Sequence, residues 1–452
     1  MAEPMSGAGL QSDTSGPQQL ASTPPRASPR LPRFHKTFSR YRDAQRSLRV
    51  PASRRSRYGL DWVNFFVADM QTGYGSFVAF YLAGLGWSQE MIGLALTTDN
   101  LFAVIGQIPG GALADSTTWK RGLAGGAILV IAAASVILAL GPSPWLIYTA
   151  QALHGLTAGV TTAAIAGISL GIVGRSAMSY RVGRNYRFSA TGNAVTGAGM
   201  GIAGSYFGPP AIFLASAALS IPALAALTAI RAEEIDYARA RNAGAGDAAT
   251  RFQRIWDLRK NRLLFIFAGA LVLFQLADAA MLPAISAHLG QDHNQNGIIT
   301  GVMMIGILVI IPQVVVALAA PWVGYHSERA GRKPLLLVGL GVQVVRALIL
   351  ALFDNYPAFA VAQVLDGITG AIIGVLTLLV VIDLTAGTGR FNLARGVVAT
   401  SSSIAAALST AGSGFLIDHL GRTAAFLAMV AAAAAAVLVV AVLLPETKPE
   451  KY

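Results

Sequence analysis

The sequence has no cysteine and little charge, and both absences restrict what the protein can be. Without thiols there are no disulfides or thiolate metal sites, and no His-x-x-x-His pair or carboxylate cluster suggests another metal centre, so we expect no cofactor. Only 12% of the 452 residues are charged, whereas soluble domains carry about 25%. Hydrophobic residues make up 54% of the chain. These features indicate a multi-pass membrane protein.

The apolar residues form twelve stretches, each long enough to cross a bilayer at about 20 residues. They predict an all-α fold with spans at 60–85, 90–114, 121–140, 144–172, 186–206, 211–230, 262–286, 297–323, 334–353, 357–384, 393–417 and 423–444. Residues 231–261 form a polar central loop that ends, at Arg254–Arg262, in the pattern of an amphipathic surface helix. Residues 1–57 are too rich in Pro, Ser, Gly and Arg to bury a core, so we expect a disordered basic tail. The tail is either a polybasic segment facing lipid or, in part, an over-extended start.

The net charge of +12 does not indicate nucleic acid, because the basic residues gather in alternate loops on one side of the membrane. These residues are Lys120 and Arg121; Arg175, Arg181, Arg184 and Arg187; the group in the central loop; Arg329, Arg332 and Lys333; and Arg390 and Arg395. Basic loops stay in the cytoplasm, so both termini, including residues 446–452, are predicted to be cytoplasmic.

Residues 324–334 form a charged hairpin between two apolar spans, with the pattern Gly-x-x-x-acid-Arg-x-Gly-Arg-Lys. This pattern resembles the loop signature of the major facilitator superfamily (MFS), found after the second and eighth helices, with Glu328 in place of the commoner Asp. A basic loop alone would not require the glycines or the acid. The resemblance implies a gate loop, a charge clasp on the inner face that favours the outward-facing state. Its residues are Gly324, Glu328, Arg329, Gly331, Arg332 and Lys333, with Gly111 and Asp115 in a degenerate copy after the second span.

Two further pairs of segments recur at nearly the same offset. Gln151-Ala-Leu-His154-Gly155 matches Gln363-Val-Leu-Asp366-Gly367, at 366 − 154 = 212. Val67-Ala68-Asp69 matches Leu276-Ala277-Asp278, at 278 − 69 = 209. The repeat indicates two homologous six-helix halves, 58–230 and 262–445. By the resemblance these form two pseudo-symmetric bundles, with substrate bound near the midplane between them.

The ionisable residues inside the spans are the candidate functional groups, because a charge at the bilayer centre costs about 2.5–3.5 kcal/mol. By the resemblance, the helices that carry Asp69, His154, Asp278 and Asp366 line one central cavity, where these groups couple proton movement to transport. The alternative is that each makes a polar contact between helices. Asp278 and Asp366 are the first choice.

Four other polar residues lie within the spans. Gln151 and Gln363 share a helix face with His154 and Asp366, and either bind substrate and orient those neighbours or bond to another helix. The family often has an arginine where Gln151 stands, so the proton route assigned to that arginine is missing. Asp99 is a second cavity acid or an interhelical contact. Arg346 lies on a peripheral helix by the resemblance, and we expect it to snorkel to the outer interface.

No nucleotide-binding loop, nucleophile elbow or metal site accompanies the spans, so the protein is not expected to be an enzyme. The sequence predicts a secondary active transporter that moves a small neutral or cationic organic solute by alternating access, coupled to protons, with efflux of a drug or metabolite favoured over nutrient uptake. A passive facilitator, a receptor and a lipid-moving protein are the alternatives. The expected partners are substrate, protons and the lipid bilayer, for a monomer in the plasma membrane of a bacterium with GC-rich coding.

Overall fold

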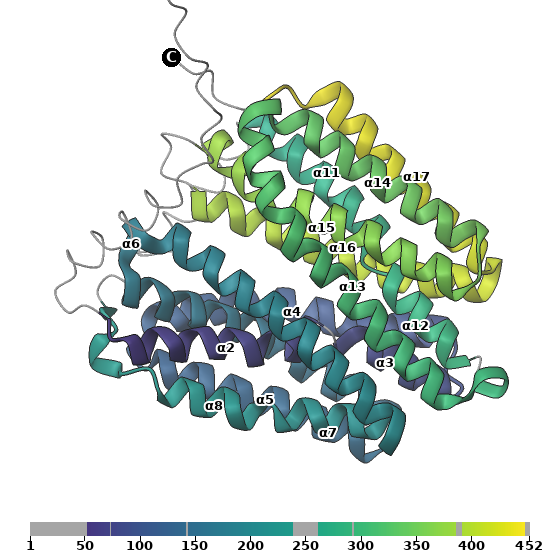
Figure 1. Cartoon of the computed structure of the whole chain (residues 1–452), viewed down its shortest axis with the longest axis horizontal. Coiled ribbons are helices and arrows are strands. Elements are labelled where there is room, and N and C mark those ends of the chain that lie inside the picture. Colours follow the sequence, from purple (N-terminus) through teal and green to yellow (C-terminus); the bar gives the residue numbers. More distant parts are fainter. Residues whose placement is uncertain are drawn as a thin grey trace, which may run out of the picture.

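The computed structural model describes residues 52–72, 74–141, 143–237, 261–291, 293–385 and 391–447, and in this part of the chain the regular elements are helices. Two bundles lie side by side (Figure 1). The N-terminal half contains α2 (Arg54–Thr72), α3 (Tyr74–Gly84), α4 (Gln89–Ser116), α5 (Lys120–Leu140), α6 (Pro144–Phe207), α7 (Pro210–Ala218), α8 (Ser220–Thr228) and the short η1 (Ala232–Glu234). The C-terminal half contains α11 (Arg262–Asp278), α12 (Met281–Gln291), α13 (His293–Ala330), α14 (Arg332–Leu352), α15 (Tyr356–Thr385), α16 (Phe391–Leu420) and α17 (Arg422–Leu443).

The helix ends differ from the predicted spans mainly where charged residues were predicted to lie in a tail or a loop. Helix α2 begins at Arg54, inside the segment that composition assigned to the tail. The predicted fourth and fifth spans are continuous in α6, which departs from helical geometry only at Gly174, where φ is 70°. A positive φ is easy for glycine, so the chain can turn there without a loop. The predicted surface helix at 254–262 lies almost wholly outside the described residues.

Eight of the described helical segments are long and apolar enough to cross a membrane by length and composition. The other four predicted spans correspond to α2 with α3, α4, the part of α6 after Gly174, and α16. Of these, α3 is apolar but only 11 residues long, and the others are more polar. Three of them pack against the opposite half, since α3 contacts α12, α4 contacts α16 and α6 contacts α13. A helix that faces protein needs fewer apolar side chains than one that faces lipid, and this accounts for the weaker hydropathy signal of α4, α16 and the second part of α6.

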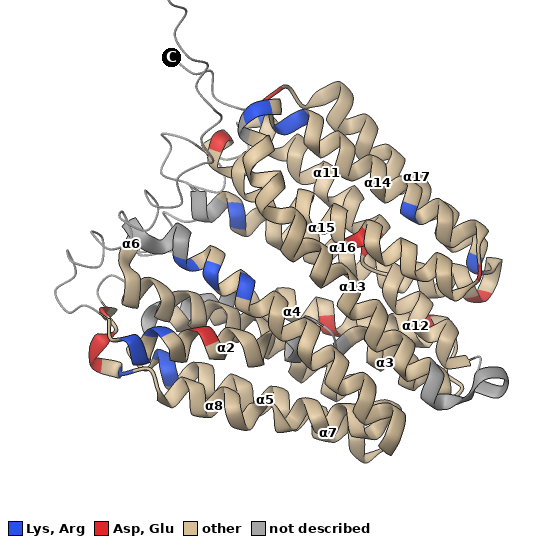
Figure 2. Cartoon of the chain, in the orientation of Figure 1, with Lys and Arg blue, Asp and Glu red and all other residues tan. Residues whose placement is uncertain are grey.

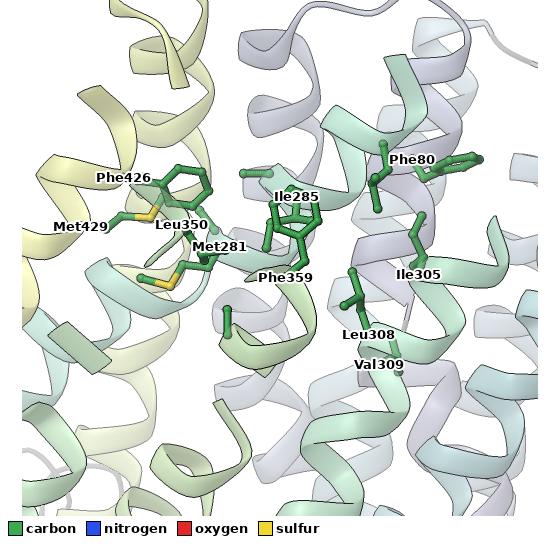
Figure 3. Close-up of a cluster of buried hydrophobic side chains, with 14 of the residues drawn as sticks. Phe80, Met281, Ile285, Ile305, Leu308, Val309, Leu350, Phe359, Phe426 and Met429 are labelled. Atoms are coloured by element: carbon green, nitrogen blue, oxygen red, sulfur yellow. The ribbon is translucent and has the colours of Figure 1, made fainter. Parts of the chain in front are cut away.

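One hydrophobic cluster joins the two halves. Phe80 from α3 lies beside Ile285 from α12 and Ile305 from α13, with Phe359 from α15 next to them (Figure 3). All four side chains are fully or almost fully buried. Large buried aromatic and aliphatic groups dominate packing energy, so this cluster holds the halves together at one end of the helices.

The other end carries most of the Lys and Arg residues (Figure 2), and we call it the basic end. There Asp61 on α2 is fully buried and forms ion pairs with Arg181 at 2.7 Å and Arg184 at 2.6 Å, both on α6. The sequence placed both arginines in a loop, whereas they lie on a helix that continues past Gly174. Burial of the aspartate is compatible with its charge because two guanidinium groups neutralise it.

The residues before α2 are hydrogen-bonded to Glu234, near the end of the N-terminal half. The Glu234 carboxylate accepts a hydrogen bond from the Ser53 backbone at 2.8 Å, and Arg231 lies 3.7 Å away. Burial alone raises the pKa of Glu234, but the hydrogen bonds from Ser53 and Ser56 and the Arg231 charge outweigh burial and hold the pKa below its ordinary 4.5. A carboxyl whose pKa is lowered by folding stabilises the fold above its unfolded pKa and ceases to do so as the pH falls through the folded pKa.

Replacing Glu234 with glutamine is therefore expected to lower stability by about 1 kcal/mol at pH 7, the usual value of a helix-start hydrogen bond. The difference from wild type should shrink below pH 4.5, where the wild-type carboxyl also becomes neutral. Thermal unfolding in detergent at pH 7 and pH 4 measures both effects. Glu233→Gln is the matched control, because Glu233 is an exposed neighbour. Equal midpoints for the two variants at pH 7 would contradict the assignment.

Candidate functional site

Three ionisable side chains meet inside the C-terminal half. Arg346 on α14 is 1% exposed and forms ion pairs with Asp278 on α11 and, at 2.8 Å, with Asp366 on α15. The amide of Gln343, one turn from Arg346, donates to Asp278 at 3.1 Å. We call Asp278, Arg346 and Asp366 the C-site. It joins three helices of the C-terminal half, α11, α14 and α15.

The C-site carries a net charge of −1 when both carboxylates are ionised and is neutral when one is protonated. Both carboxylate side chains are 25% exposed, whereas the guanidinium between them is almost fully buried. The buried Nε of Arg346 has no hydrogen-bond partner among the described residues. The two carboxylates can therefore bind one more positive charge, and the Nε of Arg346 can donate a hydrogen bond to one more acceptor atom.

The expectation for Arg346 was wrong. It does not snorkel to the interface, because the two aspartates hold it inside the bundle. Sequence position gave no direct signal for this pairing. The available hint was charge balance, since two predicted buried acids in one half require a buried partner and Arg346 is the arginine well inside a predicted span of that half.

The N-terminal half contains a smaller ionisable site. His154 on α6 is 1% exposed, and its Nδ1 lies 2.7 Å from a carboxylate oxygen of Asp99 on α4. In this pair, which we call the N-site, Asp99 contacts another helix through a titratable group, and its role as a second cavity acid stays a prediction. Protonation of the imidazole would change the pair from net −1 to neutral, as one proton does in the C-site.

The two predicted glutamines are completely buried. Gln151 lies on α6 three residues before His154, and Gln363 lies on α15 three residues before Asp366. Neither amide oxygen nor amide nitrogen has a hydrogen-bond partner among the described residues. They do not orient His154 or Asp366 through a direct hydrogen bond in this structure. Unsatisfied buried amides are costly, so these two positions remain candidates for contact with water or substrate.

The remaining predicted site residues lie at the basic end or outside the described part. Asp69 on α2, Gly111 and Asp115 on α4, and Glu328 on α13 are outside the residues whose side chains are described. Helix α13 continues to Ala330 and α14 starts at Arg332, so the predicted hairpin is reduced to a turn at Gly331 with φ 97°. Gly324 therefore lies within α13 rather than in a loop.

The described contacts of the charged gate residues Arg329, Arg332 and Lys333 are with other residues of the C-terminal half. Arg332 pairs with Asp383 at 3.1 Å, and its backbone N–H donates to Glu446 at 2.7 Å. The Lys333 backbone also donates to Glu446, at 3.1 Å, and the Arg329 guanidinium lies 4.3 Å from the ring centre of Tyr325. These contacts fix the start of α14. The charge clasp therefore stays a prediction for another conformation.

The halves make their described hydrogen bonds to each other along α4 and α16. At the end opposite the basic end, the Asp418 carboxylate on α16 accepts from the backbones of Gln89 and Glu90 at 3.0 and 2.6 Å. Further along, Thr97 donates to the Ala407 carbonyl at 2.8 Å. An acid at a helix N-terminus is favourable, so Asp418 links the first turn of α4 to the other half.

Two six-segment helical halves, each with an ionisable pair or triad inside, define a multi-pass membrane transporter. The chain belongs to the Major Facilitator Superfamily, whose family model matches residues 61–311 and 267–452. It is a transporter and not an enzyme.

The relatives include uncharacterized MFS-type transporter Rv2456c of Mycobacterium tuberculosis, which is 36% identical over 391 residues, 86% of this chain and 93% of that protein. Inner membrane transport protein YajR of Escherichia coli is 36% identical over 113 residues, 24% of this chain and 23% of that protein. Among solved structures, nucleoside transporter NupG superposes with a TM-score of 0.68 at 14% identity, covering 85% of this chain and 97% of that one. Peptide transporter POT in complex with sulfate gives 0.70 at 13%, covering 90% and 97%. The structural matches confirm the predicted fold.

Proposed function

We propose that the protein is a proton-coupled secondary transporter in which the C-site binds a proton and the transported solute. The observation that carries the proposal is one buried arginine shared by Asp278 and Asp366. A net charge inside a bilayer is unfavourable, so the halves move most easily when the site is neutral. Protonation of one carboxyl, or binding of a cationic solute beside it, makes the site neutral.

The same charge balance supports a small neutral or cationic organic solute as substrate. An anionic solute would change the net charge of the C-site from −1 to −2 when both carboxylates are ionised, which is unfavourable inside the bilayer. A neutral solute could use the free acceptor capacity of the carboxylates and the unpaired Nε of Arg346. Efflux of a drug or metabolite is the direction we favour, and nutrient uptake is the alternative.

The contacts between halves support an alternating-access mechanism. The positive-inside rule assigns the basic end to the cytoplasm, with both termini there, so the contacts between Asp418 and the start of α4 lie at the outer end. We therefore interpret the structure as an inward-facing state of a monomer in a bacterial plasma membrane. In the opposite state the gate loop would close the basic end, and the link through Asp418 would open.

The test is proton flux in liposomes that contain the purified protein and a trapped pH-sensitive dye. A panel of organic cations and neutral solutes is added under an imposed pH gradient. We expect substrate-dependent proton movement to fall at least tenfold in Asp278→Asn and Asp366→Asn, because neither amide can exchange a proton.

Glu233→Gln is the matched control and should retain wild-type flux, since Glu233 is exposed at the basic end. The sign of the gradient that drives solute accumulation distinguishes efflux from uptake. Solute movement that ignores the pH gradient, in wild type and variants alike, would indicate passive facilitation and contradict the proposal.

A further inference from the structure

A groove of about 400 Å³ lies at the basic end, between α5 and α8. These helices run along the edge of the N-terminal half that is remote from the C-terminal half (Figure 1). The groove is therefore separate from both the C-site and the N-site. Its lining includes Trp119, Arg121, Gly125, Leu224, Leu227 and Tyr237.

One side of the groove is apolar. A Cβ atom placed on Gly125 would lie 3.4 Å from Leu227 and 3.5 Å from Leu224, which is ordinary contact distance. The glycine therefore leaves room for about one methyl group beside Leu224 and Leu227, and these three residues form the apolar wall of the groove. A hydrocarbon chain fits such a surface, since burying each CH₂ group is favourable by about 0.8 kcal/mol.

The other side of the groove carries the partly buried side chain of Arg121. Arg121 has a buried Nε that no hydrogen-bond acceptor among the described residues satisfies. A buried guanidinium nitrogen without an acceptor is unfavourable, so the position suits an anionic oxygen from outside the chain.

Tyr237 is also part of the groove lining, and its hydroxyl is a hydrogen-bond donor. Burial raises the pKa of Tyr237, the Arg121 charge lowers it and Glu233 raises it, so the pKa stays above its usual range. The phenol therefore remains protonated at neutral pH. Trp119, at the first turn of α5, is 74% exposed, as is common for tryptophan at the level of lipid headgroups.

The start of α5 in the N-terminal half differs from the equivalent start of α14 in the C-terminal half. Arg332, the first residue of α14, corresponds to Lys120, the first residue of α5, at 332 − 120 = 212. The backbone at the start of α14 is capped by the carboxylate of Glu446. Among the described residues, no side chain makes a capping hydrogen bond at the start of α5. Its N-terminus, beside Arg121, thus favours an anion.

We propose that this groove binds one anionic phospholipid of the cytoplasmic leaflet. The phosphate lies against Arg121 and the first turn of α5, and an acyl chain lies along Gly125, Leu224 and Leu227. A phospholipid would contact both the apolar side and the Arg121 side of the groove, whereas a free phosphate would leave the apolar side empty. The lipid would brace α5 against α8 at the basic end of the N-terminal half.

Binding can be measured by native mass spectrometry of the detergent-purified protein titrated with phosphatidylglycerol, with phosphatidylcholine and inorganic phosphate as comparisons. We expect one tight phosphatidylglycerol site that is weakened about tenfold by Arg121→Gln and by Gly125→Leu, which fills the groove. Arg55→Gln, which removes an exposed arginine at the same end, should change binding less than threefold. Thermal unfolding of each variant checks that the fold is kept.

Equal weakening by Arg121→Gln and Arg55→Gln would mean general attraction to a basic surface and would overturn the proposal. Inorganic phosphate that binds as tightly as phosphatidylglycerol, with Gly125→Leu unaffected, would show a simple anion site and would also overturn it. If Gly125→Leu fails to fold, Gly125→Val replaces it as the groove-filling variant.

Discussion

Replacing Arg346 with glutamine is expected to abolish transport and to destabilise the protein by about 3–5 kcal/mol, the usual effect of removing one partner from a buried ion pair. The guanidinium is 1% exposed and holds both Asp278 and Asp366. Without it, two carboxylates would lie close together inside the bundle with no cation. They would then repel each other and would be ionised together only at a high cost in free energy.

The measurements are thermal unfolding in detergent and the liposome flux assay. Arg422→Gln is the matched control, because Arg422 pairs with Asp354 at 2.8 Å at the exposed outer end, where such pairs contribute about 0–1 kcal/mol. Adding Asp366→Asn to Arg346→Gln removes one of the two unpaired charges, so we expect partial recovery of stability without recovery of transport. An Arg346→Gln protein that keeps more than a third of wild-type flux would refute the role of the C-site.

Replacing Gly414 with alanine is expected to prevent the close contact between α16 and α4 and thereby to depopulate the observed state. A Cβ atom at this position would collide with the carbonyl oxygen of Gln89 and would lie 3.1 Å from the Cα of Glu90. Both neighbours are backbone atoms, so the strain cannot be relieved by a side-chain rotation. Overpacking of this kind costs about 1–3 kcal/mol, enough to shift a two-state equilibrium by about fivefold to a hundredfold.

Gly412 provides the matched control. It lies two residues away on the same helix, and a Cβ atom placed there has nothing within 4 Å. Gly412→Ala should therefore leave the distribution of states unchanged.

The absence of cysteine makes the measurement direct, since a pair of spin labels can be introduced without background thiols. Labels at Leu85 and Leu420, both exposed, report the separation of the two halves at the outer end. In Gly414→Ala the distance should increase and transport should fall by at least tenfold. An unchanged distance distribution in Gly414→Ala would show that α4 and α16 tolerate the added atom.

The sequence alone determined the membrane class, the helical fold, the internal repeat and the family, because each depends on patterns read along the chain. Long apolar runs predict spans regardless of how the helices pack. A constant offset of about 212 residues aligns Gln151 with Gln363 and His154 with Asp366 without any structure. The spans that face the other half were also found, although their polar residues weaken the hydropathy signal.

Only the tertiary structure decided which ionisable groups meet. Arg346 was assigned to the membrane interface, yet it lies between Asp278 and Asp366, and the partner of Asp99 was unknown until His154 was found beside it. The physical reason is helical geometry: an error of one residue in the phase of a helix rotates its side chains by about 100°, and span ends are uncertain by more than that. Contacts between helices depend on this rotation and on the depth of each helix, which a sequence pattern does not specify.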